Sequence, residues 1–307
     1  MITSIVMATY NGEKVIEEQL QSIVNQTANI HEVIICDDCS TDQTIQVIQN
    51  FIVEHKLEES WVLHQNKQNL GYCDNFRQAC YMAKGELIFF ADQDDIWKLD
   101  KVEVMSQLIE NQPEIEMLAA DFIPFYNELE YQKAKSNVVI TDYNVQEIPF
   151  SQKNLYLRSV GCTMAVRREL LEIIRPYWYS GWAQDEIIWK LSLCRKTGFT
   201  TNYQSIYRRF HDGNTSGKKM HNVKSRIAYL SNLEKSFKQM HQFLLANNGP
   251  KENLKLIKKN VLMANYRQRV INNKSIYAAL LLLIHGLNTY HKKRAWLMEL
   301  KIGLNGV

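Results

Sequence analysis

An α/β fold with a mostly parallel sheet flanked by helices is predicted for the first two thirds of this 307-residue chain. Short β-rich runs alternate with segments of helical periodicity, as expected of βαβ units. The predicted strands end in polar residues, which is typical of open sheets that bind a ligand outside the carboxyl ends of their strands. Beyond residue 217 the strand pattern stops and long helical patterns follow. A helical region should therefore follow the α/β domain.

The elements of the α/β part are predicted in the order strand, helix, strand, helix. SIVMATY predicts the first strand, and apolar residues at helical spacing over 13–26 predict the first helix. HEVIICDD predicts the second strand, and Thr41 or Asp42 is placed to cap a second helix over 41–55. Further strands are predicted at SWVLHQN, GELIFFADQDD, IEMLAADFIPF, GCTMAVRREL and TTNYQSIYRRF, with loops at ENQP and VQEIPF.

The last ninety residues differ from the rest in charge as well as in pattern. Residues 218–307 hold 17 Lys/Arg against three Asp/Glu, which leaves 19 against 30 in residues 1–217. Their helical patterns break at NNGP (247–250) and at NNK (272–274). These changes predict a domain boundary near Lys218, with a domain over 1–217 and a basic helical region over 218–307.

Three polar clusters follow predicted strands and are expected to converge on one crevice. They are Tyr10-Asn11, Asp37-Asp38 and the aspartates of DQDD at 92–95. Adjacent carboxylates raise each other's pKa unless a cation or hydrogen bonds compensate. A helix cap requires only one such residue. Because hard divalent ions prefer oxygen ligands, the DQDD run predicts a Mg²⁺ or Mn²⁺ site.

Five motifs, in this order, carry a resemblance to a known family: ATYNG, CDDCSTDQT, NLGYCDNF, FFADQDDIWK and WAQDEIIWKL. Over residues 1–217 the chain resembles family 2 glycosyltransferases of GT-A fold. It is most similar to the rhamnosyltransferase-like subset of bacterial cell-wall and capsule enzymes, for which DQDDIW, an Arg-rich strand and HxxNTSG are typical. The resemblance implies a nucleotide-binding half over 1–100 and an acceptor half over 101–217.

The resemblance also implies roles for the residues at the strand ends. Ala8 and Tyr10 would lie at the nucleotide, and Asp38 would accept the imide N–H of a uracil or thymine base. Asp92 would lie near the ribose. Asp94 would bind the metal ion that holds the diphosphate, with Asp95 as the alternative ligand.

Asp185 in WAQDEIIW matches the family's catalytic aspartate, although Gln184 stands where the family usually has Glu. It would accept the proton of the acceptor hydroxyl as that oxygen attacks the anomeric carbon, which inverts the configuration there. Glu186 is the competitor for this role. A carboxylate in the first turn of a helix is also favoured by the helix dipole, and the two interpretations are compatible.

His211 in RRFHDGNTSG follows the last predicted strand and is expected either to complete the metal site or to be structural. Its neighbours Arg208 and Arg209 are expected near diphosphate oxygens. Trp182 is assigned equally to stacking on a sugar ring or to the core. The expected partners are a UDP- or dTDP-sugar donor and a glycan or lipid-linked acceptor, and the transferred sugar is expected to be a hexose or rhamnose.

Three rival functions are compatible with parts of this pattern. An oxidoreductase would need GxGxxG after the first strand, where ATYNGEKV stands instead. A nucleotidyltransferase would need a Gly-rich, Lys/Arg-bearing loop near the N-terminus, and the sequence lacks such a loop there. A catalytically inactive sugar-nucleotide-binding subunit that recruits a partner remains the alternative, and the presence of both the metal and base carboxylates argues against it.

The basic tail is open to two interpretations. SIYAALLLLIHGL is too short to span a bilayer and is followed by HKKRAW. The segment either docks on the anionic inner leaflet, beside a lipid-linked acceptor, or forms a buried helix or a homodimer interface. No nucleic-acid partner is expected. The N-terminus lacks signal-peptide features, so a cytoplasmic protein, peripheral to the inner membrane face if the tail docks there, is expected.

Overall fold

The computed structural model describes residues 1–135, 143–211, 223–291 and 294–305. The chain forms two compact units: unit 1 comprises Met1–Ile148 and Leu157–Gly213, and unit 2 comprises Pro149–Tyr156 and Asn214–Val307. The boundary predicted near Lys218 lies outside the described residues. The division of the first domain into nucleotide and acceptor halves stays a prediction.

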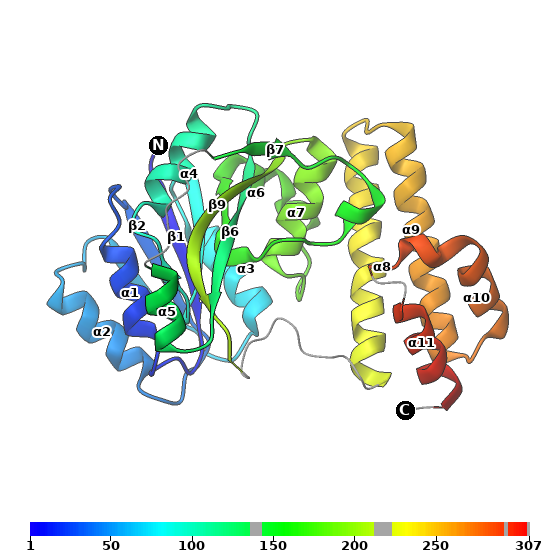
Figure 1. Ribbon diagram of the computed structural model, residues 1–307, viewed down its shortest axis with the longest axis horizontal. Helices are drawn as coiled ribbons and strands as arrows, with labels where there is room; N and C mark the ends of the chain where they lie inside the picture. Colours follow the sequence, from blue (N-terminus) through cyan, green and yellow to red (C-terminus); the bar gives the residue numbers. More distant parts are fainter. Residues whose placement is uncertain (136–142, 212–222, 292–293, 306–307) are drawn as a thin grey trace. The chain divides into compact units, whose positions relative to one another are not determined.

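The N-terminal half of unit 1 is a parallel sheet, as predicted. Its strands lie in the order β3-β2-β1-β4 and pair in parallel throughout. Figure 1 shows α1 and α2 on one face of the sheet and α3, with the later α6 and α7, on the other. These elements are β1 (Thr3–Thr9), α1 (Ile16–Val24), β2 (Glu32–Asp37), α2 (Thr44–Glu54), β3 (Trp61–Gln65), α3 (Tyr72–Met82) and β4 (Leu87–Asp92).

The second half of unit 1 makes the sheet mixed. β8 runs antiparallel to both β4 and β6, whereas β9 is parallel to β6 and antiparallel to β5 and β7. The strands are β5 (Ile96–Trp97), β6 (Met117–Phe125), β7 (Val145–Glu147), β8 (Met164–Arg167) and β9 (Gly198–Arg209). The helices are α4 (Lys101–Glu110), α5 (Glu128–Lys135), α6 (Arg168–Ile174) and α7 (Gln184–Arg195), with 3₁₀ turns η2 (Gly161–Thr163) and η3 (Arg175–Tyr177).

Two short strands were not predicted. The prediction of a loop over VQEIPF is wrong at residues 145–147, because β7 pairs there with the start of β9. β5 pairs with the end of β9 immediately after the DQDD run. Both strands are too short for periodicity to reveal them.

The core of unit 1 lies on both faces of the parallel strands. Ile5 and Phe89 pair on one face and Val6 and Phe90 pair on the other, and all four are completely buried, since helices cover each face of the sheet. This explains why the strand sequences are nearly continuous apolar runs up to the point where they end in polar residues. A rigid, buried sheet therefore fixes the positions of the polar strand ends.

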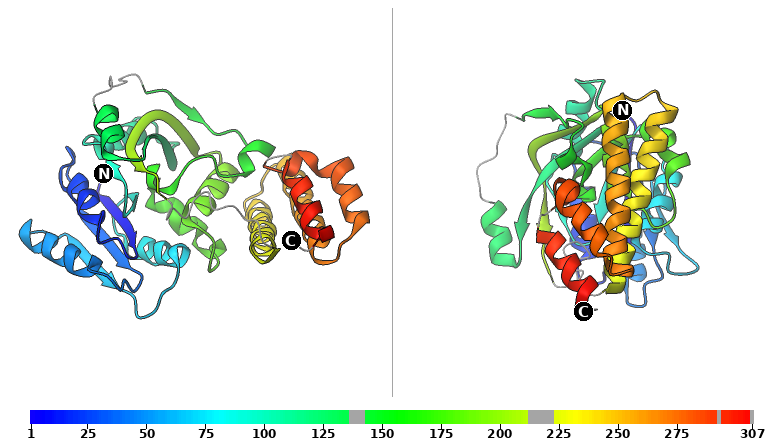
Figure 2. Two further views of the ribbon diagram at one scale, coloured as in Figure 1. Left: turned by 60° about the horizontal axis from the view of Figure 1, so that its bottom comes forward. Right: turned by 90° about the vertical axis from the view of Figure 1, so that its right-hand side faces the viewer.

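Unit 2 is helical, with breaks where the sequence predicts them. α8 and α9 run side by side, and α10 and α11 pack against α9 (Figure 2). The elements are η1 (Gln152–Leu155), α8 (Val223–Ala246), α9 (Lys251–Asn272), α10 (Ile276–Leu281), a π-helical turn η4 (Leu282–Gly286), η5 (Leu287–Thr289) and α11 (Arg294–Asn305). Within the described residues, no helix is both long and apolar enough to cross a membrane.

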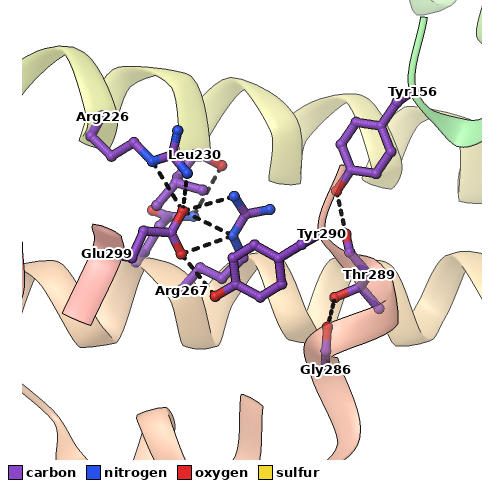
Figure 3. A network of polar contacts seen from close by, with 9 residues as sticks. Tyr156, Arg226, Leu230, Arg267, Gly286, Thr289, Tyr290 and Glu299 are labelled. Carbon is purple, nitrogen blue, oxygen red and sulfur yellow. Dashed lines mark hydrogen bonds and ion pairs between the residues drawn. The ribbon is translucent and has the colours of Figure 1, made fainter. Parts of the chain in front are cut away.

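A buried ionic network joins three helices of unit 2 (Figure 3). Glu299 of α11 is 1% exposed and accepts hydrogen bonds from Arg226 Nε of α8 at 3.0 Å and Arg267 Nη2 of α9 at 2.7 Å. The Tyr290 hydroxyl donates to the same carboxylate at 2.8 Å, and the Tyr156 hydroxyl donates to the carbonyl of Thr289. Two guanidinium groups thus compensate the charge of the buried Glu299 carboxylate and link α11 to α8 and α9.

Candidate functional site

The carboxyl ends of β1, β2 and β4 meet, as predicted. Tyr10 and Gln93 bond reciprocally, with the Tyr10 N–H donating at 2.8 Å and the Gln93 amide nitrogen donating back at 3.0 Å. The Asn11 side chain accepts the N–H of Thr41 at 2.8 Å, and Asn11 itself has a φ of 50°. Hydrogen bonds between loops thus hold the three polar clusters at one edge of the sheet.

The two aspartates after β2 are buried and strongly bonded within the protein. Asp37 accepts hydrogen bonds from Thr9 Oγ1 at 3.0 Å and from the N–H of Ser40 at 2.9 Å. Asp38 accepts from the N–H groups of Leu70 at 2.7 Å and Gly71 at 2.8 Å. The Asp38 carboxylate therefore anchors the loop before α3, and the predicted bond to a base would have to use its remaining acceptor capacity.

Ala8 and Tyr10 occupy the strand end at which a nucleotide is predicted. Ala8 is partly exposed and lies in register between Cys36 of β2 and Asp92 of β4. Tyr10 is 48% exposed. Its backbone, and not its side chain, forms the hydrogen bonds to Gln93. An exposed aromatic ring at this edge is available for contact with a base or ribose.

The three aspartates of DQDD occupy different environments. Asp94 is partly exposed, and its Oδ2 lies 2.7 Å from His211 Nε2. Asp92 is also partly exposed, and burial, followed by the charge of Asp94, raises its pKa to about 6. Asp95 is 2% exposed, and burial, with the charges of Asp92 and Asp94, raises its pKa to about 8. The raised pKa values indicate that full ionisation of these carboxylates is unfavourable without a cation.

One oxygen of the buried Asp95 carboxylate has no nitrogen or oxygen partner among the described residues, and the Cys162 thiol lies beside this carboxylate. Oδ1 accepts the N–H of Arg209 at 3.1 Å, whereas Oδ2 accepts no hydrogen bond from a nitrogen or oxygen of the described residues. Carboxylate oxygens of Asp92 and Asp95 and the Cys162 sulfur lie within 4.8 Å of one another. An orphaned acceptor beside a second carboxylate is what a cation would satisfy.

A buried lysine lies behind this cluster. Lys101 Nζ donates to the carbonyl of Cys162 at 2.7 Å and lies 3.4 Å from the centre of the Trp97 ring. Burial lowers the pKa of Lys101 to about 7, although the charges of Asp95 and Asp92 act in the opposite direction. A partly protonated lysine offsets only part of the carboxylate charge in front of it.

The structure brings the residues at the end of β9 to the same cluster. Arg209 Nε donates to the carbonyl of Asp94 at 3.0 Å, and its guanidinium pairs with Glu18. Arg208 is buried, with its guanidinium about equally far from the rings of Phe122 and Phe210, and its charge acts to lower the pKa of Asp92. The rest of the HxxNTSG motif lies outside the described residues.

Asp185 is partly exposed in the first turn of α7, on the other side of a glycine turn from the aspartate cluster. A Cβ on Gly161 would lie 3.3 Å from Asp185 Cβ and 3.8 Å from its Oδ2. The next residue of that turn, Cys162, faces Asp92 and Asp95. The pKa of Asp185 is raised to about 7. Burial is the largest cause, the charge of Glu186 comes next, and the charge of Asp92 has a weaker effect in the same direction.

Glu186, the competitor for the base role, is already committed to other partners. Its Oε1 forms an ion pair with buried Lys190 at 2.5 Å, and its Oε2 accepts Trp182 Nε1 at 3.1 Å. By contrast, Asp185 Oδ1 accepts only the adjacent N–H of Glu186 at 2.7 Å among the described residues. The geometry favours Asp185 as the carboxylate that is free to accept a proton.

The prediction that Trp182 stacks on a sugar does not hold in this conformation, since its side chain is 0% exposed. Its ring stacks on Tyr179, with centroids 4.9 Å apart. The alternative prediction of a core tryptophan is therefore the correct one. Burial follows from the loop before α7, where Trp178 Nε1 donates to the Trp182 carbonyl at 2.8 Å.

Several residues of this region were not predicted as functional. Tyr72, at the start of α3, is half exposed; burial of its hydroxyl group is the largest cause that raises its pKa, and the charges of Asp185 and Glu186 contribute less. Asp74 accepts the Ser180 hydroxyl at 2.6 Å and so supports the loop before α7. NLGYCDNF contains both residues, but its letters carry no indication that α3 lies beside α7. Gly161 and Cys162 gave no sequence signal.

Divalent cation binding fits the residues at this site. Two carboxylates, one of them with an orphaned oxygen, face one another at Asp92 and Asp95, and a carboxylate and an imidazole meet at Asp94 and His211. Oxygen and imidazole ligands suit Mn²⁺, and oxygen ligands suit Mg²⁺. The thiol of Cys162 is a softer ligand that neither ion prefers.

The comparison with family models identifies residues 4–174 as "Glycosyl transferase family 2". Among curated proteins, the chain is 33% identical over 102 residues to the putative teichuronic acid biosynthesis glycosyltransferase TuaG of Bacillus subtilis, covering 33% of this chain and 39% of TuaG. It is 38% identical over 100 residues to the dTDP-rhamnosyl transferase RfbG of Shigella flexneri, covering 32% of this chain and 34% of RfbG.

A longer match joins this chain to the UDP-Glc:alpha-D-GlcNAc-diphosphoundecaprenol beta-1,3-glucosyltransferase WfaP of Escherichia coli. The identity is 27% over 224 residues, covering 71% of this chain and 81% of WfaP. The chain spans less than two thirds of the length of several other curated relatives, including TuaG and RfbG.

Solved structures share the fold across the whole chain. Staphylococcus aureus TarS 1–349 in complex with UDP-GlcNAc has a TM-score of 0.63 at 17% identity, covering 100% of this chain and 92% of that one. The Pyrobaculum calidifontis mannosyltransferase PcManGT with GDP-Man and Mn²⁺ has a TM-score of 0.54 at 18% identity, covering 99% and 84%. Fold, family model and relatives agree: the chain is a GT-A protein that belongs to glycosyl transferase family 2.

Proposed function

We propose that this protein is an inverting, metal-dependent glycosyltransferase of bacterial surface polysaccharide synthesis. It would move a hexosyl or rhamnosyl group from a UDP- or dTDP-sugar to a hydroxyl of a glycan or lipid-linked acceptor. One observation carries the proposal: the Gly161–Cys162 turn has the free carboxylate of Asp185 on one side and the Asp92–Asp95 cluster on the other. This arrangement supports a base and a diphosphate site that one bound sugar would reach together.

The donor would lie along the ends of β1, β2 and β4. Tyr10 and Ala8 would contact the nucleoside, Asp38 the imide of its base, and Asp92 the ribose. Asp94 and His211 would hold Mn²⁺ or Mg²⁺, with Asp95 as the alternative ligand. When bound, the ion would neutralise charge on the diphosphate. The names of RfbG and WfaP, which specify dTDP and UDP donors, support these two nucleotides.

Asp185 would act on the acceptor. Its carboxylate would accept the proton of the attacking hydroxyl, a bond would form from that oxygen to the anomeric carbon, and the bond from this carbon to the diphosphate would break. The half-buried environment that raises its pKa to about 7 makes it a stronger base than an ordinary aspartate. Attack from the face opposite the leaving group inverts the configuration.

The name of one relative supports a lipid-linked acceptor, and the basic C-terminal region supports a location at the membrane surface. WfaP is named for a diphosphoundecaprenol-linked acceptor, and a soluble catalytic unit working on such a lipid benefits from a membrane-docking region. The basic C-terminal helices are the candidate for this role at the inner leaflet. A homodimer through these helices is the alternative use of the same region.

A two-stage experiment tests the proposal. UDP- and dTDP-sugars are first screened for Mn²⁺-dependent thermal stabilisation, because a ligand that binds the folded state raises the melting temperature. Release of nucleoside diphosphate is then measured with lipid-linked and glycan acceptors. Stabilisation by a donor without any release in the presence of acceptors would favour the inactive binding subunit. A donor that stabilises equally without a divalent ion would refute the metal-dependent site.

A further inference from the structure

The α10 and η4 segment of unit 2 carries large apolar side chains that point to solvent. These residues are between 43% and 70% exposed. Their spacing of i, i+1, i+4, i+7 and i+8 places them on one face of the helical segment. We name this face the α10–η4 ridge; its members are Ile276, Tyr277, Leu280, Leu283 and Ile284.

The opposite face of the segment packs through small residues. Ala278 and Ala279 are buried in a cluster with Leu282 and with Met263 of α9. A Cβ on Gly286 would lie 2.9 Å from Met263 Sδ, so the close approach of η4 to α9 depends on the missing side chain. Apart from Leu282, the segment therefore buries small residues and exposes large apolar ones, the reverse of an ordinary surface helix. Neither a fully buried helix nor a solvated basic face describes it.

The stretch of chain that contains the ridge is basic. Residues 253–307 contain ten Lys/Arg and one Asp/Glu, which is Glu299. Glu299 is buried in its network with Arg226 and Arg267, so it presents no charge at the surface. Lys274, at the start of the segment, and Arg294, at the start of α11, are exposed. Among the described residues of this stretch, the exposed charges are all positive.

We propose that the α10–η4 ridge inserts into the headgroup region of an anionic lipid bilayer, with the surrounding cations on the lipid phosphates. An apolar face and a basic rim are the two signals that together give stable interfacial binding, whereas either one alone binds weakly. Tyr277 is suited to the headgroup level, where tyrosine is enriched. The segment is too short to span the bilayer, so it lies in the interface.

Charge argues for lipid over a second copy of this chain. A two-fold contact through the ridge would bring two basic rims together without exposed carboxylates from this stretch to compensate them. An anionic bilayer supplies the missing negative charge. The inference deepens the membrane location stated under the proposed function, and it concerns residues that take no part in the proposed chemistry.

Flotation of the full-length protein with vesicles tests the ridge. The vesicles contain either phosphatidylglycerol mixed with phosphatidylcholine or phosphatidylcholine alone. The ridge variant is Tyr277→Ser with Ile284→Ser, and the matched control is Leu245→Ser with Leu262→Ser, which removes two exposed apolar side chains from α8 and α9 of the same unit. Melting curves check that both variants fold.

The wild type and the control variant should float with the anionic vesicles, and the ridge variant should bind them at least about tenfold more weakly. Lys274→Gln with Arg294→Gln should reduce the preference for anionic over neutral vesicles. A wild type that does not float, a ridge variant that floats as well as the wild type, or a control variant that loses binding equally would each overturn the inference.

Two further measurements separate the alternatives. Sedimentation velocity without lipid should show the same oligomeric state for the wild type and the ridge variant; conversion of a dimer to a monomer by the ridge variant would identify a second copy as the occupant and overturn lipid binding. Donor-dependent thermal stabilisation should be equal in the two proteins. If flotation fails while donor stabilisation persists, the membrane inference fails and the proposed function stands.

Discussion

Replacing Asp185 by Asn tests the proposed base most directly. The amide has the same shape as the carboxyl group and can keep the hydrogen bond from the Glu186 N–H, but it cannot accept the proton of the acceptor. We expect turnover to fall by about a hundredfold or more, the usual scale for loss of a general base. Donor affinity should change little, because Asp185 is not among the residues expected to contact the nucleotide.

The pH dependence gives a second, more specific signature. A base with a pKa of about 7 is deprotonated in roughly one molecule in eleven at pH 6 and in roughly ten in eleven at pH 8. The wild-type rate under subsaturating substrate should therefore rise about tenfold over this interval. An aspartate of ordinary pKa would be deprotonated throughout, and the rate would be flat. The Asn variant should lose the rise together with the activity.

Stability provides the control for misfolding. The pKa of Asp185 is raised in the folded protein, so its contribution to the free energy of unfolding is fully present below about pH 4 and is lost as the pH rises through about 7. Asn carries no charge at any pH. The Asp185→Asn variant should thus melt at or above the wild-type temperature at pH 8, so that loss of activity there cannot come from unfolding.

The assay measures nucleoside diphosphate release between pH 5.5 and 9 with the donor found by the thermal screen. Glu186→Gln is the neighbouring comparison: because the charge of Glu186 helps to raise the pKa of Asp185, its removal should shift the rising limb to lower pH. It also deprives buried Lys190 of its ion pair, so it is assayed at low temperature. A normal rate for Asp185→Asn together with an inactive Glu186→Gln would refute the assignment.

Three further perturbations separate the parts of the molecule. Asp94→Ala should abolish Mn²⁺-dependent donor binding in calorimetric titrations, and unchanged affinity would move the ion to another carboxylate. Gly161→Ala would place a Cβ 2.9 Å from the Gln184 amide; turnover should fall more than donor affinity, and equal losses would contradict a role confined to positioning Asp185. Glu299→Ala leaves two buried guanidinium groups without their carboxylate and should lower the unfolding free energy in urea by about 3–5 kcal/mol. A loss under about 1 kcal/mol would show that the network is not stabilising.

Much of the fold follows from patterns within short windows of sequence. The run SIVMATY contains all but the first residue of β1, because a parallel strand buried on both faces is a continuous apolar run. The NNGP break separates α8 from α9, because Pro250 cannot continue a helix and Asn248 takes a positive φ there. Signals of this kind depend on the local chain alone.

The rest of the fold depends on pairing between strands that are far apart in the sequence, so a short segment of sequence cannot reveal it. β7 has three residues and β5 has two, and each is a strand only because β9 offers an edge. The direction of β8, antiparallel to its neighbours, is set by how the chain returns to the sheet. The prediction of a mostly parallel sheet therefore holds for the first four strands of the order and turns into a mixed sheet beyond them.

The candidate site shows the same division. Motifs point to Asp94 and Asp185, but the sequence contains no indication that the Gly161–Cys162 turn lies between Asp185 and the Asp92–Asp95 cluster, or that Trp182 is buried beside Tyr179. Nor could the sequence reveal that the Asp38 carboxylate is already bonded to the N–H groups of the loop before α3. These relations arise from distances in space between residues far apart in the chain.

Burial explains how the adjacent Asp94 and Asp95 can have different roles. Asp95 accepts a hydrogen bond from the backbone of Arg209 and is 2% exposed. Its carboxylate therefore lies below the surface of the cluster and cannot easily contact a ligand that enters from solvent. Asp94 is partly exposed and already lies 2.7 Å from His211, an exposed residue at the end of β9. A diphosphate must arrive from solvent, and an ion that bridges to it needs ligands at the surface of the cluster. We therefore expect Asp94 to bind the ion directly. Asp95, whose raised pKa favours its protonated form near neutral pH, would contribute a negative charge only when a cation lies beside it.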